Sequence, residues 1–221
     1  MKSRSKLQMA TLLLGILSCP PAFATVVAVG PGAFPAGSTL IDFGGLASGT
    51  EVNGLTVSGV LFNYLVGGSP LNGAVTIDGG PGTTNNITPN NIVSIGNDTG
   101  TLTMVLPNTA SIFGYGYAIL ATVSVANATT ISLFSGSTSV GSLSYNGTPD
   151  PTFTGGFAGI QSTIPFDRVA VTFNSVAAQA FALDDVRFNT IPEPSTMWLV
   201  LSSAVGALLW RRRTLLAAFR R

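Results

Sequence analysis

The chain has 221 residues, a length that fits one domain with short targeting segments at its ends. Between residues 25 and 190 it holds two arginines, no lysine and eight acidic side chains, which gives this stretch a net charge of −6. Such a stretch cannot neutralise a run of phosphates, so we exclude nucleic-acid binding. The chain has no histidine and only one cysteine, which excludes Ser-His-Asp catalysis, a disulfide framework and a zinc site of the usual His/Cys kind.

Residues 1–24 have the pattern of a secretory signal peptide. A basic start precedes an apolar run over residues 7–17, which is too short to span a bilayer comfortably. Ala22 and Ala24 form a small-x-small cleavage site, so we expect cleavage after Ala24. The alternative is a lipoprotein box that ends at Cys19, in which case the cysteine carries a lipid.

Residues 25–190 have the composition of an all-β domain, because short apolar stretches recur between Gly-rich turns and no long stretch shows helical spacing. Between residues 168 and 174, Val169, Val171 and Phe173 fall on one face, as in a half-buried antiparallel strand. Many short strands in one domain predict two packed sheets, a β-sandwich or jelly roll. The predicted strands are Ser38–Phe43, Leu55–Tyr64, Ile92–Ile95, Thr101–Leu106, Ser111–Val125, Thr130–Ser135, Ser139–Tyr145, Phe157–Gln161, Arg168–Asn174 and Phe181–Phe188.

An aromatic cluster, Phe113, Tyr115 and Tyr117, is spaced by glycines and lies on one face of a predicted strand. We interpret it as core packing, in which the glycines admit large rings. The alternative is a platform on which sugars stack. The ring donors available for sugar binding are Tyr64, Tyr115, Tyr117 and Tyr145.

The stretch Phe181–Phe188 resembles the last strand of galactose-binding-like jelly rolls, in which an Asp often ligates a structural calcium ion. The first and last strands of jelly rolls commonly lie side by side, which predicts that Asp42 lies near Asp184 and Asp185. Only one of two adjacent side chains can face inward, and we expect this to be Asp184. These three carboxylates are the predicted calcium ligands, since calcium needs oxygen and neither His nor Cys. The alternative is that the adjacent pair caps a strand end or pairs with Arg187.

Residues 191–221 carry the most specific pattern in the sequence. A Pro-Glu-Pro triplet precedes an apolar run over residues 197–210, with a tryptophan at each end, and an arginine cluster follows. This pattern predicts a single transmembrane helix whose arginines stay in the cytoplasm. From Ser195 to Trp210, at about 1.5 Å per residue, such a helix covers roughly 24 Å, which is short of a hydrocarbon core of about 30 Å. The triplet is Pro192, Glu193 and Pro194, and the cluster is Arg211, Arg212 and Arg213.

This C-terminal pattern resembles the PEP-CTERM sorting domain of Gram-negative bacteria. The resemblance implies an exosortase as partner, a membrane enzyme that recognises the Pro-Glu-Pro triplet and cleaves near it, with the arginine cluster as the stop-transfer signal. Members of that family usually end at the arginines, whereas residues 214–221 follow them here.

The three segments together predict an exported protein with a signal peptide at 1–24, a β-sandwich ectodomain at 25–190 and a sorting segment at 191–221. The C-terminal helix anchors the protein in the inner membrane with its ectodomain in the periplasm, and processing delivers it to the cell surface or extracellular matrix. We expect a non-catalytic structural ectodomain with no cofactor beyond structural calcium, because adjacent Asp184 and Asp185 cannot form the carboxylate pair of a glycosidase. The alternative is a module that binds exopolysaccharide.

Overall fold

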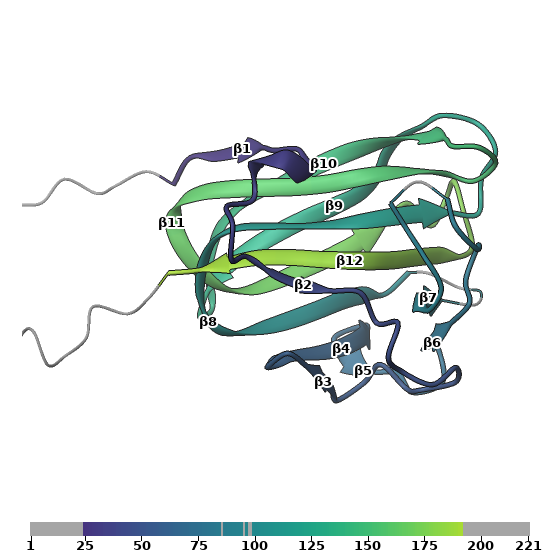
Figure 1. Ribbon diagram of the computed structural model, residues 1–221, viewed down its shortest axis with the longest axis horizontal. Helices are drawn as coiled ribbons and strands as arrows, with labels where there is room; N and C mark the ends of the chain where they lie inside the picture. Colours follow the sequence, from purple (N-terminus) through teal and green to yellow (C-terminus); the bar gives the residue numbers. More distant parts are fainter. Residues whose placement is uncertain (1–23, 85, 95, 97–98, 192–221) are drawn as a thin grey trace, which may run out of the picture.

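The described part of the chain is built almost entirely of β-strands (Figure 1). The structure, a computed structural model, describes residues 24–84, 86–94, 96 and 99–191. Its one helical element is a single 3-10 turn, η1 (Pro31–Ala33). The prediction of an all-β domain is therefore confirmed. The strands are β1 (Val26–Ala28), β2 (Thr39–Ile41), β3 (Leu55–Val57), β4 (Val60–Val66), β5 (Ser69–Pro70), β6 (Val75–Asp78), β7 (Asn91–Ser94), β8 (Thr101–Ile119), β9 (Val125–Ser135), β10 (Thr138–Pro149), β11 (Thr154–Phe173) and β12 (Phe181–Thr190).

The two helices predicted from the sequence are not part of this domain. The signal helix and the span at residues 197–210 lie outside the described residues, as do the Pro-Glu-Pro triplet and the arginine cluster. Among the residues that are described, no helix is both long and apolar enough to cross a membrane.

Two long strands, β8 and β11, run through both layers of the sandwich. The first part of β8 pairs with β4 and with the end of β11, and its second part pairs with β12 and with the start of β11. The sequence predicts two separate strands in each case, which is wrong. Pro107 and Pro165 explain the error, because proline cannot donate a ladder hydrogen bond and looks like a break. The β8–β11 register shifts between Gln161 and Phe166, so the strands bend there without ending.

The core lies between the two layers. On β11, Val169 and Val171 are completely buried and alternate with partly exposed Arg168 and Ala170, which confirms the predicted face. On β8, the same alternation buries Leu102 and Met104 in one layer and the aromatic cluster in the other. Full burial of each such side chain contributes roughly 1.5–3 kcal/mol, so this alternation accounts for much of the stability.

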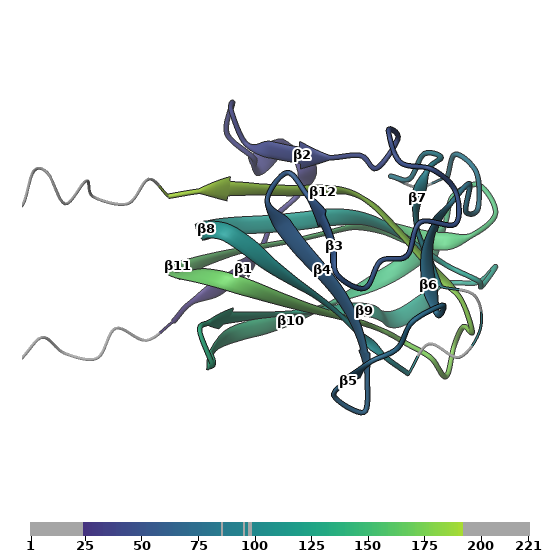
Figure 2. The same ribbon diagram turned by 90° about the horizontal axis from the view of Figure 1, so that it is seen from below.

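Both ends of the described domain lie at the same end of the sandwich (Figure 2). Val26 pairs with Ser162 of β11, and Thr190 pairs with Ala110 of β8, close to the bend that the two long strands share. Strand β12 leads from the opposite end to Thr190, a length of roughly 30 Å at about 3.3 Å per residue. The segments at 1–24 and 191–221 therefore attach to one end, and Phe181 at the start of β12 marks the other.

Candidate functional site

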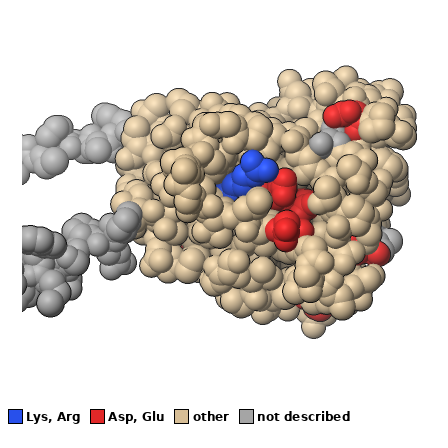
Figure 3. Space-filling model, viewed as in Figure 1, with Lys and Arg blue, Asp and Glu red and all other residues tan. Residues whose placement is uncertain are grey.

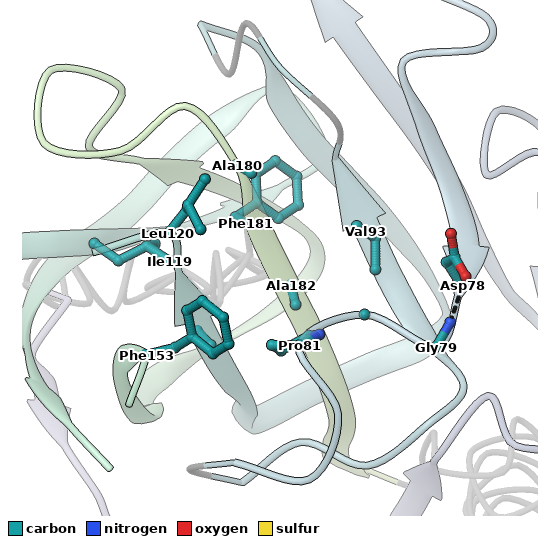
Figure 4. A pocket seen from close by; sticks show the side chains of 12 residues that line it. Asp78, Gly79, Pro81, Val93, Ile119, Leu120, Phe153, Ala180, Phe181 and Ala182 are labelled. Atoms are coloured by element: carbon teal, nitrogen blue, oxygen red, sulfur yellow. Dashed lines mark hydrogen bonds between the residues drawn. The ribbon is translucent and has the colours of Figure 1, made fainter. Parts of the chain in front are cut away.

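The described domain has an apolar pocket of about 370 Å³ at the end opposite its two termini (Figure 4). Phe153 lies on one side of it, and Asp78 lies on the other, where its Oδ1 accepts the backbone N–H of Gly79 at 2.6 Å. A pocket of this size and character is suited to a small ligand or to part of a larger one. Its lining residues are Asp78, Gly79, Gly80, Pro81, Val93, Ala118, Ile119, Leu120, Phe153, Ala180, Phe181 and Ala182.

Residues 79–84 and 86–90, which we call the covering loop, cover the outer face of the layer that contains β12. The start of this loop forms one wall of the pocket. Farther along, Ile87 packs against Ala118 and Ala182 in a small apolar cluster separate from the main core. The backbone oxygen of Asn86 lies 2.0 Å from the point where a Cβ atom of Gly116 would stand. Only glycine at position 116 lets the loop come this close.

Asp184 lies beneath the covering loop and is completely buried. Its Oδ2 accepts the backbone N–H of Thr88 at 2.8 Å and the Thr88 hydroxyl at 3.0 Å, whereas its Oδ1 has no hydrogen-bond partner. Burial raises the pKa of Asp184 to about 6, although the hydrogen bonds from Thr88 act in the opposite direction. The loop is thus fastened to the sheet by a carboxyl group that is costly to bury in charged form.

Asn91 continues this polar network at the edge of β7. Its Nδ2 donates to the backbone oxygen of Thr88 at 3.1 Å, and its Oδ1 is buried without a hydrogen bond. The side chain also packs closely against Gly80 of the pocket wall. Asn91 therefore connects the polar site beneath the loop with the pocket.

The structure does not bring the three carboxylates predicted to bind calcium together as a ligand set. Strand β2 does pair with β12, and Asp184 is the buried member of the adjacent pair, as expected. Asp42, however, is exposed, and its Oδ1 accepts the N–H of Gly44 at 3.3 Å. Asp185 forms an ion pair with Arg187 at 3.0 Å, which is the predicted alternative for that residue. Within the described ranges, no three His, Cys, Asp or Glu side chains come together as metal ligands.

Charged groups are scarce on the surface, and Figure 3 shows basic side-chain atoms beside acidic ones near the centre of this face, with other acidic side chains apart from them. Arg187, one of the two arginines of the described domain, pairs with Asp185. The second, Arg168, lies 4.0 Å above the ring of Phe134 and donates to the backbone oxygen of Gly136 at 3.4 Å. Neither arginine therefore forms a free basic patch.

The aromatic cluster packs in the core, as the preferred interpretation predicts. Tyr115 and Tyr117 are 0% exposed and Tyr64 is 1% exposed, so none of the three presents a ring face to a sugar. Their use as ring donors is thus wrong, because the sandwich interior takes up the whole inward face of β8. Tyr145 is partly buried, and its hydroxyl donates to the backbone oxygen of Gly159 at 2.5 Å. Burial raises the pKa of Tyr117 to about 12.

The covering loop, Thr88 and Asn91 are absent from the sequence-based expectations. The Gly-Gly-Pro-Gly run at 79–82 indicates a turn, which is what the structure has there, but nothing in the sequence shows that this turn folds over the sheet. The sequence features that could have indicated a loop packed on this face are Gly116 and an Asp near the start of the last strand.

By its architecture the described part of the chain is a β-sandwich domain, and a separate segment follows its last strand. Residues 190–213 match the PEP-CTERM protein-sorting motif, so the chain carries the sorting motif that its C-terminal pattern predicts. The match ends at Arg213, the last residue of the arginine cluster. This motif indicates export and sorting to the cell envelope.

The fold has distant similarities among solved structures. A mutant of CBM29-2, a family 29 carbohydrate-binding module, aligns with a TM-score of 0.38 and 10% identity over 78% of this chain and 99% of that one. The catalytic domain of a GH87 α-1,3-glucanase in complex with tetrasaccharides aligns with a TM-score of 0.31 and 12% identity over 61% of this chain and 29% of that one. No curated protein matches the chain in sequence.

Proposed function

We propose that this protein is a structural component of the cell envelope or extracellular matrix, exported and then processed by an exosortase, with a β-sandwich ectodomain that has no catalytic role. The observation that carries the proposal is the PEP-CTERM sorting motif at 190–213, which begins at the last residue of β12. The sorting segment is thus directly continuous with the folded domain.

The placement of the ends supports a simple topology. The signal peptide precedes Val26 and the sorting segment follows Thr190, and both residues lie at one end of the sandwich. A C-terminal helix that holds the protein in the inner membrane therefore leaves the opposite end, with the pocket, facing away from the membrane. The positive-inside rule assigns the arginine cluster to the cytoplasm, which puts the domain in the periplasm before processing.

A non-catalytic role is supported by the position of the acidic side chains. Asp184, whose pKa is raised, is closed beneath the covering loop, and its neighbour Asp185 is paired with Arg187. A glycosidase needs two carboxyl groups that flank an accessible glycosidic bond. These two residues do not meet that need.

Substitution of Glu193 by alanine tests the sorting step. Since the triplet is the part that the exosortase recognises, we expect the variant to accumulate in the membrane fraction with its C-terminal segment intact, while the unchanged protein reaches the surface or medium. Immunoblots of cell fractions with a tag placed after Thr25 measure this. Thr214→Ala, beyond the matched motif, is the control and should behave as the unchanged protein. Equal release of both variants would contradict sorting through the triplet.

A second candidate function is carbohydrate binding at the pocket. The observation that favours it is the combination of the Phe153 ring, which can stack on a sugar, with the Asp78 carboxylate, which can accept hydrogen bonds from hydroxyl groups. This site replaces the buried tyrosines as the place where a sugar could bind.

A glycan array tests this second function with the exported protein. We expect binding to a neutral oligosaccharide to weaken about five- to tenfold in Phe153→Ala, since one lost stacking contact of about 1–1.5 kcal/mol corresponds to roughly that factor. Val176→Ala is the matched control, because Val176 is 98% exposed and is not among the residues that line the pocket. Binding that is absent from the whole array, or unchanged in Phe153→Ala, would rule out this role for the pocket.

A further inference from the structure

Two buried oxygen atoms beneath the covering loop lack hydrogen bonds, and they belong to residues on adjacent strands. These are Oδ1 of Asp184 and Oδ1 of Asn91, both in side chains that are 0% exposed. A buried acceptor without a partner destabilises the folded state, and more so when it is charged. The arrangement is therefore unfavourable unless something else supplies positive charge to these oxygens.

The strand register places these two side chains on one face of the sheet, and the close contact at Gly116 adds a third oxygen to that face. Asp184 pairs with Gly116 on β8, and one step beyond the last pair of the β7–β12 ladder, Leu183 with Ile92, it lies opposite Asn91. Side chains of directly opposed residues point to the same face, with Cβ atoms about 4.5–5.5 Å apart. The backbone oxygen of Asn86 lies 2.0 Å from the point where a Cβ atom of Gly116 would stand, so it is on the same side of the sheet as the Asp184 carboxylate.

The domain supplies no cationic side chain for this oxygen-rich spot. Residues 25–190 contain only two arginines. Arg187 pairs with Asp185, and Arg168 lies over Phe134. Thr88 satisfies one carboxylate oxygen of Asp184 and leaves the other one open.

We propose that this spot binds a calcium ion, with Oδ1 of Asp184, the backbone oxygen of Asn86 and Oδ1 of Asn91 as protein ligands. Calcium accepts carboxylate, amide and backbone oxygens in irregular arrangements and completes its shell with water, whereas magnesium demands a near-ideal octahedron. Asn86 is exposed, so the site lies directly beneath the surface of the domain. A single carboxylate predicts weak binding, in the range of about 10⁻⁴–10⁻³ M that is typical of extracellular modules.

The site differs from the three-carboxylate set expected from the sequence, because only Asp184 is common to both. It also gives calcium a mechanical role, since the ion joins the covering loop to β12 and β7. The start of the same loop forms one wall of the pocket. The inference does not depend on the sorting function or on sugar binding.

Thermal unfolding of the exported protein with calcium and with a chelator tests the proposal. At a calcium concentration about 100 times Kd, ligand linkage should raise Tm by roughly 5–10 °C above the value in chelator. Magnesium at the same concentration should have a much smaller effect. Identical curves with calcium and chelator would overturn the site, and an equal rise with magnesium would overturn its assignment to calcium.

Two test variants and two control variants distinguish calcium binding from a merely structural role of these residues. Asp184→Asn should lose the calcium response and, in chelator, melt at or above the Tm of the unchanged protein, since it removes a buried charge. Asn91→Asp adds a carboxylate of the same shape, so it should strengthen the calcium response. Asp185→Asn and Asp42→Asn are the matched controls and should respond as the unchanged protein does. An unaltered calcium response in Asp184→Asn contradicts the proposal.

Discussion

Replacing Phe113 by alanine is expected to lower the free energy of unfolding by about 3–5 kcal/mol. The side chain is 0% exposed, and its ring centre lies 6.0 Å from that of Tyr115. Its strand neighbours are Ile160 on β11 and Phe188 on β12, so the cavity would open where three strands of one layer meet. Urea unfolding monitored by circular dichroism measures the loss.

The control for this substitution is Val176→Ala, which removes an exposed side chain and should change stability by no more than about 0.5 kcal/mol. The comparison also decides between the two interpretations of the aromatic cluster. If Phe113→Ala unfolds like the control but loses affinity for a polysaccharide, the cluster is a stacking platform and its placement in the core is wrong.

Gly116→Ala is expected to detach the covering loop. The added Cβ would stand 2.0 Å from the backbone oxygen of Asn86, and a backbone atom cannot move aside as the end of a flexible side chain can. Forcing an extra carbon into such a contact costs about 1–3 kcal/mol. We therefore expect lower stability together with faster hydrogen exchange at the amide of Thr88, which donates to Asp184.

The matched control is Gly45→Ala, because an added Cβ at Gly45 meets no atom within 4 Å. It should leave both the unfolding curve and the exchange rate of the Thr88 amide unchanged. Slow exchange at Thr88 in Gly116→Ala would show that the loop does not lie as closely on β8 as we describe.

The strands of the sandwich are largely predictable, because alternation of apolar and polar side chains is a local property. The pattern Val169, Val171, Phe173 predicts a strand and its buried face, and the structure has the strand with Val169 and Val171 fully buried and Phe173 partly buried. The local pattern does not show that a strand continues past a proline. A proline at position 107 or 165 looks like the end of a strand, whereas neighbouring strands hold β8 and β11 together through the bend.

The polar site beneath the covering loop is not predictable in the same way. Burial of Asp184 can be anticipated from alternation, but its partners depend on where a loop nearly 100 residues earlier in the chain comes to rest. Asp42 is close to β12 in the sheet, yet its side chain turns to its own loop. The sorting motif is different again, since a linear motif can be read without knowledge of the fold.

Intact mass of the protein recovered from the cell surface or medium is the most direct test of the central claim. In a strain that contains an exosortase, the protein should begin at Thr25 and lack the end from Arg211 to Arg221. After deletion of the exosortase gene, the same protein should stay in the membrane fraction and keep its full C-terminus. Recovery of only full-length C-termini at the surface of the exosortase-containing strain would contradict the account.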